Sequence, residues 1–139
     1  MNGGRVLALD YGSARCGCAV TDPTGTIVTP IDPVLRPGTR KGFNRVLGVV
    51  RERGVKRVVV GLPVTLRGTD SAQTTEVREF AAKLTEAVRV PVELYDERFT
   101  TSIAAQRGGA RSEDSRAAAV LLEDWLTLTT ARDQAEVTH

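Results

Sequence analysis

The alternation of apolar and polar positions predicts three strands near the start of the chain. Residues 5–9 are almost continuously apolar, which is typical of a strand buried on both faces. Residues 15–21 predict a second strand, joined to the first by a glycine-containing turn as an antiparallel hairpin. Residues 26–29 predict a third strand, and the prolines in its continuation to Leu35 restrict that continuation to a sheet edge or a loop.

From Phe43 onward the apolar residues recur at helical spacing (i, i+3, i+4, i+7), which predicts a helix that ends at Gly54. The elements predicted after it are a strand at 57–62, a helix capped by Ser71, a strand at 90–95, a short helix at 99–106, and a last helix capped by Ser112 that runs from Glu113 to about Leu128. This order predicts an α/β fold with a mixed five-stranded sheet flanked by helices. The first three strands are antiparallel, and the first, fourth and fifth are parallel. We assign residues 1–129 to one domain and residues 130–139 to a polar, disordered C-terminal tail.

Length and composition are those of one ordinary globular domain. The chain has 139 residues, of which 41% are hydrophobic and 26% are charged. No apolar run approaches the ~18 residues that cross a bilayer. The N-terminal segment also lacks the apolar core of a signal peptide. We therefore expect a cytoplasmic protein without a membrane partner.

The net charge of +2 hides an uneven distribution. Nine Lys and Arg residues and one acidic residue, Glu52, lie between Pro33 and Thr69, so this segment carries +8 and the rest of the chain −6. A basic segment of this kind suits an anionic polymer as partner. The same pattern also fits a solvated helix face, so charge by itself leaves both interpretations open.

The two cysteines, Cys16 and Cys18, do not predict a zinc site, because the chain has no second Cys pair and its only histidine is His139. In one strand they point to the same face, at a spacing near the limit for an unstrained disulfide. We expect two small buried hydrophobic residues. An exposed face would instead permit an intermolecular disulfide.

Acidic residues follow the ends of the predicted parallel strands, where open α/β sheets form their sites. Asp10 ends the first strand, and Asp96 and Glu97 follow the fifth. Asp114 begins the last helix on the face that carries apolar residues four, seven and eleven positions later. An acid in this first turn would also complement the helix dipole. The topology predicts that these acids converge on one edge of the sheet.

Converging carboxylates repel one another unless a proton or a cation lies between them. Because the chain offers no His or Cys ligand to this cluster, a hard cation that prefers oxygen, Mg²⁺ or Mn²⁺, fits best. Two such ions would suit the hydrolysis of a phosphodiester bond. The basic segment agrees with this chemistry, because nucleic acids are held through their phosphates.

Four blocks of sequence carry a resemblance to a known family. They are ALDYGSARCGCAVTDPTG, VVVGLPVTLRGTDSAQTTEVREFAAKL, YDERFTTSIAAQ and DSRAAAVLLEDWL. In this order they resemble the YqgF/RuvX family over about residues 5–128, which implies a ribonuclease-H-like fold. The resemblance implies that Asp10, Glu97 and Asp114 are the catalytic and metal-binding acids, and it favours Glu97 over Asp96. The first block departs from the family's usual D-Y-G-T-K-R-I-G-V-A.

Members of this family are described as Holliday junction resolvases and as pre-16S rRNA nucleases. The resemblance therefore implies a metal-dependent nuclease that acts on structured nucleic acid, and the sequence does not choose between branched DNA and precursor rRNA. The basic residues that we expect to bind phosphates are Arg15, Arg40, Lys41, Arg67, Arg98 and Arg111. A four-way junction would also suit a homodimer with two active sites.

Two other functions stay open at this point. A non-catalytic nucleic-acid-binding protein would use the same basic segment. The stretch LDYGSARCGCAVTD also resembles the phosphate-binding hairpin of actin-like ATPases and sugar kinases, which would make the chain a fragment of a nucleotide phosphotransferase. Those proteins close two such domains over ATP, whereas 139 residues suit one domain, and the chain has no Walker motif.

Overall fold

The computed structural model describes residues 4–63, 71–96 and 113–137, with the backbone alone for residues 113–114 and 130–137. Its elements are, in chain order, β1 (Arg5–Asp10), β2 (Arg15–Thr21), β3 (Val28–Leu35), α1 (Arg40–Glu52), β4 (Val55–Leu62), α2 (Ala72–Ala87), β5 (Val92–Asp96) and α4 (Glu113–Val137). The predicted helix at 99–106 and the predicted cap Ser112 lie outside the described residues.

The five strands form one mixed sheet in the order β3-β2-β1-β4-β5. The β1–β2 and β2–β3 pairs are antiparallel, and the β1–β4 and β4–β5 pairs are parallel, which confirms the predicted fold class. β3 contains Pro30 and Pro33, and it lies at the edge of the sheet, where a missing amide hydrogen is tolerated. Because two antiparallel pairs connect them, β3 and β1 run in the same direction and end at the same edge.

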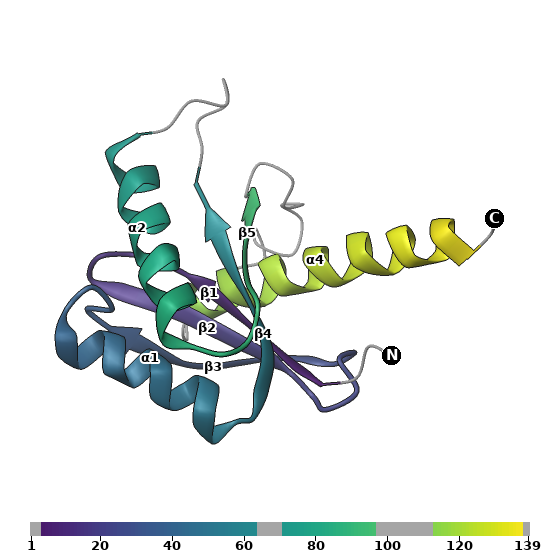
Figure 1. Cartoon of the computed structure of the whole chain (residues 1–139), viewed down its shortest axis with the longest axis horizontal. Helices are drawn as coiled ribbons and strands as arrows, with labels where there is room; N and C mark the ends of the chain where they lie inside the picture. Colours follow the sequence, from purple (N-terminus) through teal and green to yellow (C-terminus); the bar gives the residue numbers. More distant parts are fainter. Residues whose placement is uncertain (1–3, 64–70, 97–112, 138–139) are drawn as a thin grey trace.

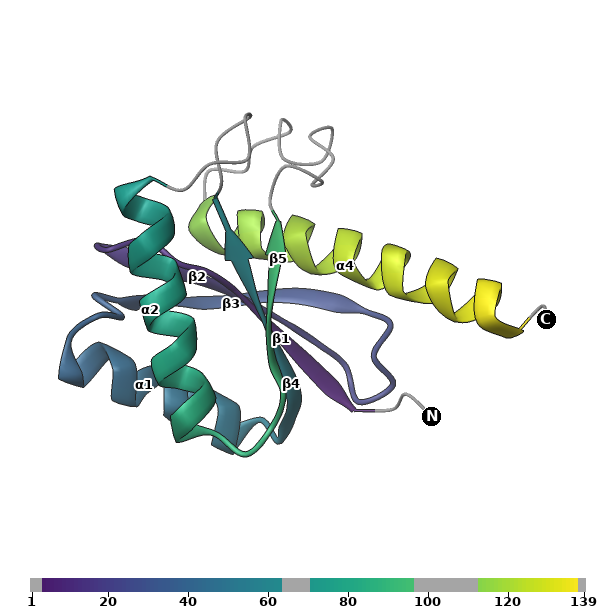
Figure 2. The ribbon, with the colours of Figure 1, turned by 45° about the horizontal axis from the view of Figure 1, so that its top comes forward.

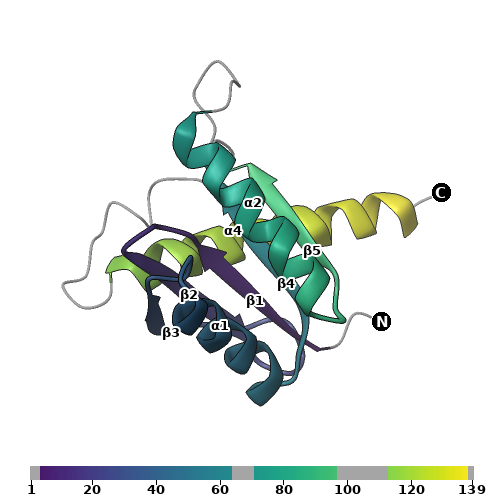
Figure 3. The same cartoon turned by 60° about the vertical axis from the view of Figure 1, so that its left-hand side comes forward.

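Two layers of helix cover the two faces of this sheet (Figures 1 and 3). α1 and α2 cover one face, and α4 crosses the other. Side chains alternate along β1, so that Leu7 and Leu9 pack under α1 and α2, while Val6 and Ala8 pack under α4. The sheet therefore separates two hydrophobic clusters, and each residue at a strand end belongs to one face or the other.

Local side-chain hydrogen bonds determine where α1 and α2 begin. The Thr39 hydroxyl accepts a hydrogen bond from the Gly42 amide, so α1 begins at Arg40, three residues before the predicted apolar series. The Ser71 hydroxyl accepts from the Thr74 amide, which confirms Ser71 as the cap of α2. Both helices then run from these caps to the ends of their apolar faces.

The predicted end of the last helix, near Leu128, is wrong, because α4 continues to Val137. No Gly or Pro interrupts the chain after residue 128, and Ala, Arg, Gln and Glu in this stretch favour helix. The helix therefore includes residues 130–137 of the segment that we assigned to a disordered tail. Figures 1 and 2 show this part of α4 extending beyond the sheet.

Cys16 and Cys18 are free thiols with no exposed surface, which confirms that they are small core residues. Within the described ranges, no helix combines the length and the apolar character that a membrane span requires.

Candidate active site

Asp10 is the last residue of β1, and glycines flank it on both neighbouring strands. Val6 and Ala8 face α4, so the alternation of the strand directs the half-buried Asp10 to the same face. Asp10 pairs with Gly17 of β2, and the register of the parallel pair puts it beside Gly61 of β4. The carboxylate is thus flanked on both neighbouring strands by residues without a side chain.

The importance of these two glycines was not predicted from the sequence, although their positions inside apolar strands indicate it. A glycine inside a strand weakens it and often marks close approach of a ligand. Gly17 interrupts the apolar run of β2, and Gly61 interrupts that of β4, and both are buried. Their meaning depends on the register, because only the pairing of the strands brings both of them next to Asp10.

Ser115 attaches the start of α4 to the sheet near the end of β1. Its hydroxyl donates to the Ile31 carbonyl (2.5 Å) and accepts from the Cys18 amide (3.3 Å), and the residue has no exposed surface. Cys18 is the cross-strand partner of Leu9, the residue before Asp10. The backbone of Asp114 therefore lies over β2 and β3, close to the strand end that carries Asp10.

The rest of α4 is packed as the sequence predicts. Ala118, Leu121 and Trp125, which share a helix face with Asp114, are all buried against the sheet. The direction of the Asp114 side chain stays a prediction. The role of Ser115 was also not predicted from the sequence. Ser115 precedes the buried Ala118 by three residues and Leu122 by seven, so helical spacing places this polar residue on the apolar stripe.

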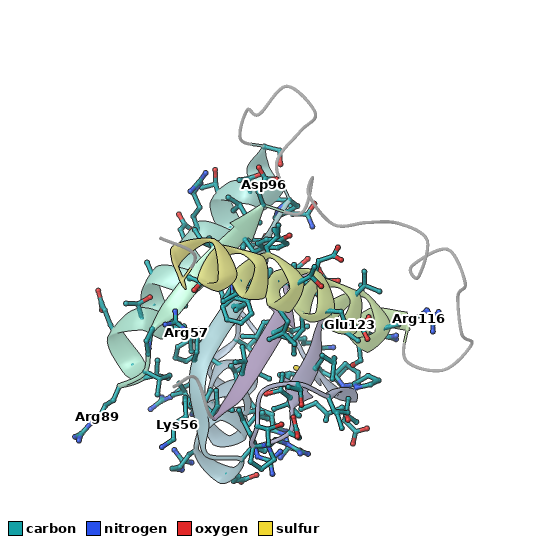
Figure 4. The ribbon with its side chains drawn as sticks, turned by 90° about the vertical axis from the view of Figure 1, so that its right-hand side faces the viewer. Lys56, Arg57, Arg89, Asp96, Arg116 and Glu123 are labelled. Atoms are coloured by element: carbon teal, nitrogen blue, oxygen red, sulfur yellow. The ribbon has the colours of Figure 1, made fainter. Side chains whose placement is uncertain are left out.

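β5 also directs alternate side chains toward α4. The Trp125 indole donates to the Glu93 carboxylate (2.8 Å), which also pairs with Arg57 (2.8 Å), and Tyr95 is buried in the α4 cluster. Asp96 is half-buried near the end of β5 (Figure 4). By alternation along the strand, its side chain belongs to the opposite face. Glu97 is the next residue in the Glu93–Tyr95 series, and it lies outside the described residues.

The surroundings of Tyr95, near the end of β5, are acidic. Burial raises the pKa of Tyr95, and the negative charges of Asp124 and Asp96 raise it further. Within the described ranges, no three His, Cys, Asp or Glu side chains gather into a metal site. Of the predicted triad, these ranges include the side chain of Asp10 and the backbone of Asp114. The donor chemistry of Asp10, Glu97 and Asp114 is oxygen alone, which fits a hard divalent cation.

Three of the six predicted phosphate-binding residues lie at the edge of the sheet where β1 ends. Arg15 begins β2 and pairs with Leu35, the last residue of β3. Arg40 and Lys41 begin α1, five residues after that strand end, and all three cationic side chains are exposed. The other three, Arg67, Arg98 and Arg111, lie outside the described residues.

Comparison with known proteins agrees with this geometry. The family described as RuvX, Holliday junction resolvase, matches residues 4–128. The chain belongs to the RuvX family. A relative from Koribacter versatilis, named "Putative pre-16S rRNA nuclease", is 42% identical over 112 residues, which cover 81% of this chain and 72% of that protein. A relative of the same name from Chloroflexus aurantiacus is 36% identical over 135 residues, with 91% and 88% covered.

Solved structures confirm the ribonuclease-H-like fold of this RuvX-family chain. RuvC of Thermus thermophilus, in complex with a Holliday junction substrate, superposes with a TM-score of 0.58 at 16% identity, covering 91% of this chain and 97% of that one. The yeast mitochondrial Holliday junction resolvase superposes with a TM-score of 0.57 at 11% identity, covering 99% and 85%.

Proposed function

We propose that this protein is a divalent-metal-dependent nuclease that hydrolyses phosphodiester bonds in structured nucleic acid. The substrate is a Holliday junction, the 5′ extension of pre-16S rRNA, or both. One observation carries the proposal: Asp10 ends a buried parallel strand between Gly17 and Gly61, with the start of α4 held beside it by Ser115. The names of the family and of its relatives support the same activity.

Asp10, Glu97 and Asp114 would hold the metal ions, Mg²⁺ or Mn²⁺, at this edge. When bound, a pair of such ions supplies an activated water and stabilises the charge on the entering and leaving oxygens. The protein residues orient the substrate. Arg15 and the basic start of α1 bind phosphates, and the two glycines leave room for the backbone of the nucleic acid to approach Asp10.

Recognition relies on the phosphate backbone and on shape. The aromatic residues of the described ranges are all buried and therefore offer no exposed platform on which bases could stack; they are Tyr11, Phe43, Phe80, Tyr95 and Trp125. The basic residues at the edge are exposed and can follow a phosphate backbone. Branched DNA and structured RNA both satisfy this mode of recognition.

The test is cleavage of a four-way DNA junction and of a 5′-extended small-subunit rRNA precursor, side by side, with Mg²⁺ and with Mn²⁺. Asp10→Asn is expected to reduce the cleavage rate by about 10³-fold or more while binding survives. Asp32→Asn provides the matched control, because Asp32 is an exposed acid of β3. It should cleave like the wild type.

Other outcomes identify the competing functions. A wild-type protein that binds both substrates but cuts neither, with either ion, is a non-catalytic nucleic-acid-binding protein. Hydrolysis of millimolar ATP would favour the phosphotransferase instead. If the substrate is a four-way junction, we expect a homodimer whose two active sites cut opposite strands. Ultracentrifugation of the protein–junction complex would detect the dimer. A cytoplasmic location stays an expectation.

A further inference from the structure

Arg36 has an unusual backbone conformation. Its φ of 46° makes it the one non-glycine residue with a positive φ in the described ranges. A positive φ raises the conformational energy of an L-residue with a side chain, and it does so less for asparagine and least for glycine. An arginine at such a position calls for a physical reason.

The main chain of Arg36 builds the turn between β3 and α1. Its amide donates to the Ala14 carbonyl (2.9 Å). Its carbonyl accepts from both the amide (3.0 Å) and the hydroxyl (2.7 Å) of Thr39, the cap of α1. Gly42 packs so closely on this carbonyl that a side chain at Gly42 would collide with it. These interactions explain the left-handed turn, and all of them would form equally well with glycine at position 36.

The side chain of Arg36 contributes nothing comparable to the fold. It is exposed, and its guanidinium group makes no hydrogen bond or ion pair within the part of the chain that the structure describes. The conformational cost of an arginine here is therefore not offset by any contact of that side chain. Strained backbone positions cluster at ligand-binding sites, and here the side chain at such a position has no hydrogen bond or ion pair of its own among the residues that the structure describes.

The position of Arg36 indicates which ligand. Arg36 directly follows the Arg15–Leu35 pair, at the edge where β1 ends in Asp10. Two strand spacings separate β3 from β1, which is about 10 Å, or roughly three base-pair steps along the axis of a duplex. Arg40 and Lys41 continue the positive charge into the first turn of α1, which contains no acidic residue. The local field therefore attracts an extended polyanion.

We propose that Arg36 is a substrate-binding residue, whose guanidinium binds a backbone phosphate a few nucleotides from the bond that is cut. This inference rests on the proposed nuclease function and adds a residue to it. The left-handed turn projects the arginine from the basic edge. Arginine makes that turn less stable than glycine would, and the phosphate contact explains why arginine is present.

The test replaces Arg36 and follows stability and binding separately. Arg36→Asn removes the charge but tolerates the left-handed conformation, and Arg36→Lys restores a positive charge. Arg89→Asn is the matched control, because Arg89 is an exposed arginine at the end of the molecule opposite Asp96 (Figure 4). Binding to a fluorescent four-way junction and to the rRNA precursor is measured by anisotropy over a salt series, with divalent ions omitted to prevent cleavage.

We expect Arg36→Asn to keep its Tm at or above the wild-type value while its affinity falls about three- to tenfold. The slope of log K against log[salt] should shrink by about 0.7–0.9, the loss of one phosphate contact. Arg36→Lys should recover most of the slope, and Arg89→Asn should leave affinity and slope unchanged.

Three outcomes would overturn the inference. Unchanged affinity and slope in Arg36→Asn would remove Arg36 from the substrate-binding surface and leave the nuclease function intact. A Tm several degrees lower would show that the side chain serves the fold. A wild-type protein that neither binds nor cuts the two nucleic acids overturns the proposed function, and the role of Arg36 with it.

Discussion

The two faces of the sheet differ in size and in chemistry. Among the described residues, the cluster under α1 and α2 has twice as many buried members as the cluster under α4, and it is almost entirely aliphatic and aromatic. The α4 face contains the fully buried Ser115 with its two hydrogen bonds, and the partly exposed Trp125–Glu93 hydrogen bond. Asp10 belongs to this second face. One face thus supplies most of the hydrophobic stabilisation, whereas the other carries Asp10, the acid of the proposed active site.

This division has a physical reason. A buried polar group costs stability unless every hydrogen-bonding atom has a partner. The hydrophobic stabilisation of a large apolar cluster offsets the cost of burying such polar groups. The comparison predicts that substitutions under α1 and α2 change stability and not activity, whereas substitutions under α4 change both.

The largest expected change in stability comes from the aliphatic face. Leu84 of α2 has no exposed surface, and Leu84→Ala should lower the free energy of unfolding by about 2–5 kcal/mol. Cleavage at a temperature well below the transition should keep its wild-type kcat. Urea unfolding measures the first quantity and a cleavage assay the second. The exposed Thr85 on the same helix provides the control, Thr85→Ala, which should lose less than about 0.5 kcal/mol. A large fall in kcat for Leu84→Ala would break the comparison.

A smaller loss of stability with a larger loss of activity is expected under α4. Ser115→Ala leaves the Cys18 amide and the Ile31 carbonyl without the Ser115 hydroxyl, which should cost about 1–3 kcal/mol. Because the start of α4 is attached there, kcat should fall as well. Thr127→Ala is the control, since its hydroxyl bonds to the carbonyl of Glu123 on the exposed side of the same helix. A wild-type kcat in Ser115→Ala would show that the attachment of the start of α4 by Ser115 does not contribute to catalysis.

The smallest change concerns Tyr11, which brings a polar hydroxyl to the aliphatic face. Its hydroxyl donates to the Glu76 carboxylate (2.6 Å) beside a cavity of about 270 Å³ that α1 and α2 also line. Tyr11→Phe should cost about 0.5–1.5 kcal/mol near pH 7. Activity should stay within a factor of two, because this contact lies on the face opposite Asp10. A much greater loss of activity would blur the distinction between the faces.

The same variant has a predicted pH dependence. Burial raises the pKa of Tyr11 above its usual value near 10, and the hydrogen bond and charge of Glu76 raise it further. The unfolded chain therefore releases this proton at a lower pH than the folded chain. The stabilisation is complete below about pH 10 and declines as the pH rises above it. Urea unfolding at pH 7, 9 and 11 should show that the difference between wild type and Tyr11→Phe shrinks only at the highest pH.

Much of the fold was predictable, because local patterns and topology rules constrain it strongly. The apolar runs of β1 and β4 and the helical spacing from Phe43 correctly predicted their elements, and Ser71 correctly predicted a cap. The end of α4 was not predictable from its apolar stripe, because helix propensity continues the helix nine residues past Leu128, the predicted end. The periodicity of apolar residues indicates which part of a helix is buried, and an exposed continuation of the helix is invisible to it.

The candidate site was predictable in its residue types and less so in its surroundings. The acids at the strand ends and at the start of the last helix are visible in the sequence, because each stands next to an apolar pattern. Ser115 and Arg36 are not, because a hydrogen bond across 84 residues and a left-handed turn leave little trace in local composition. Both become evident only when the contacts of the backbone are known.

The sequence by itself determined the type of sheet, the acidic and oxygen-only character of the donors, and the excess positive charge of the middle segment. These follow from the identity and spacing of residues along the chain. Tertiary structure alone decided that Gly17 and Gly61 flank Asp10, that Ser115 holds the start of α4 beside it, and that Arg36 projects from the same edge. Strand register and helix docking set these neighbours, and both depend on contacts between residues far apart in the chain.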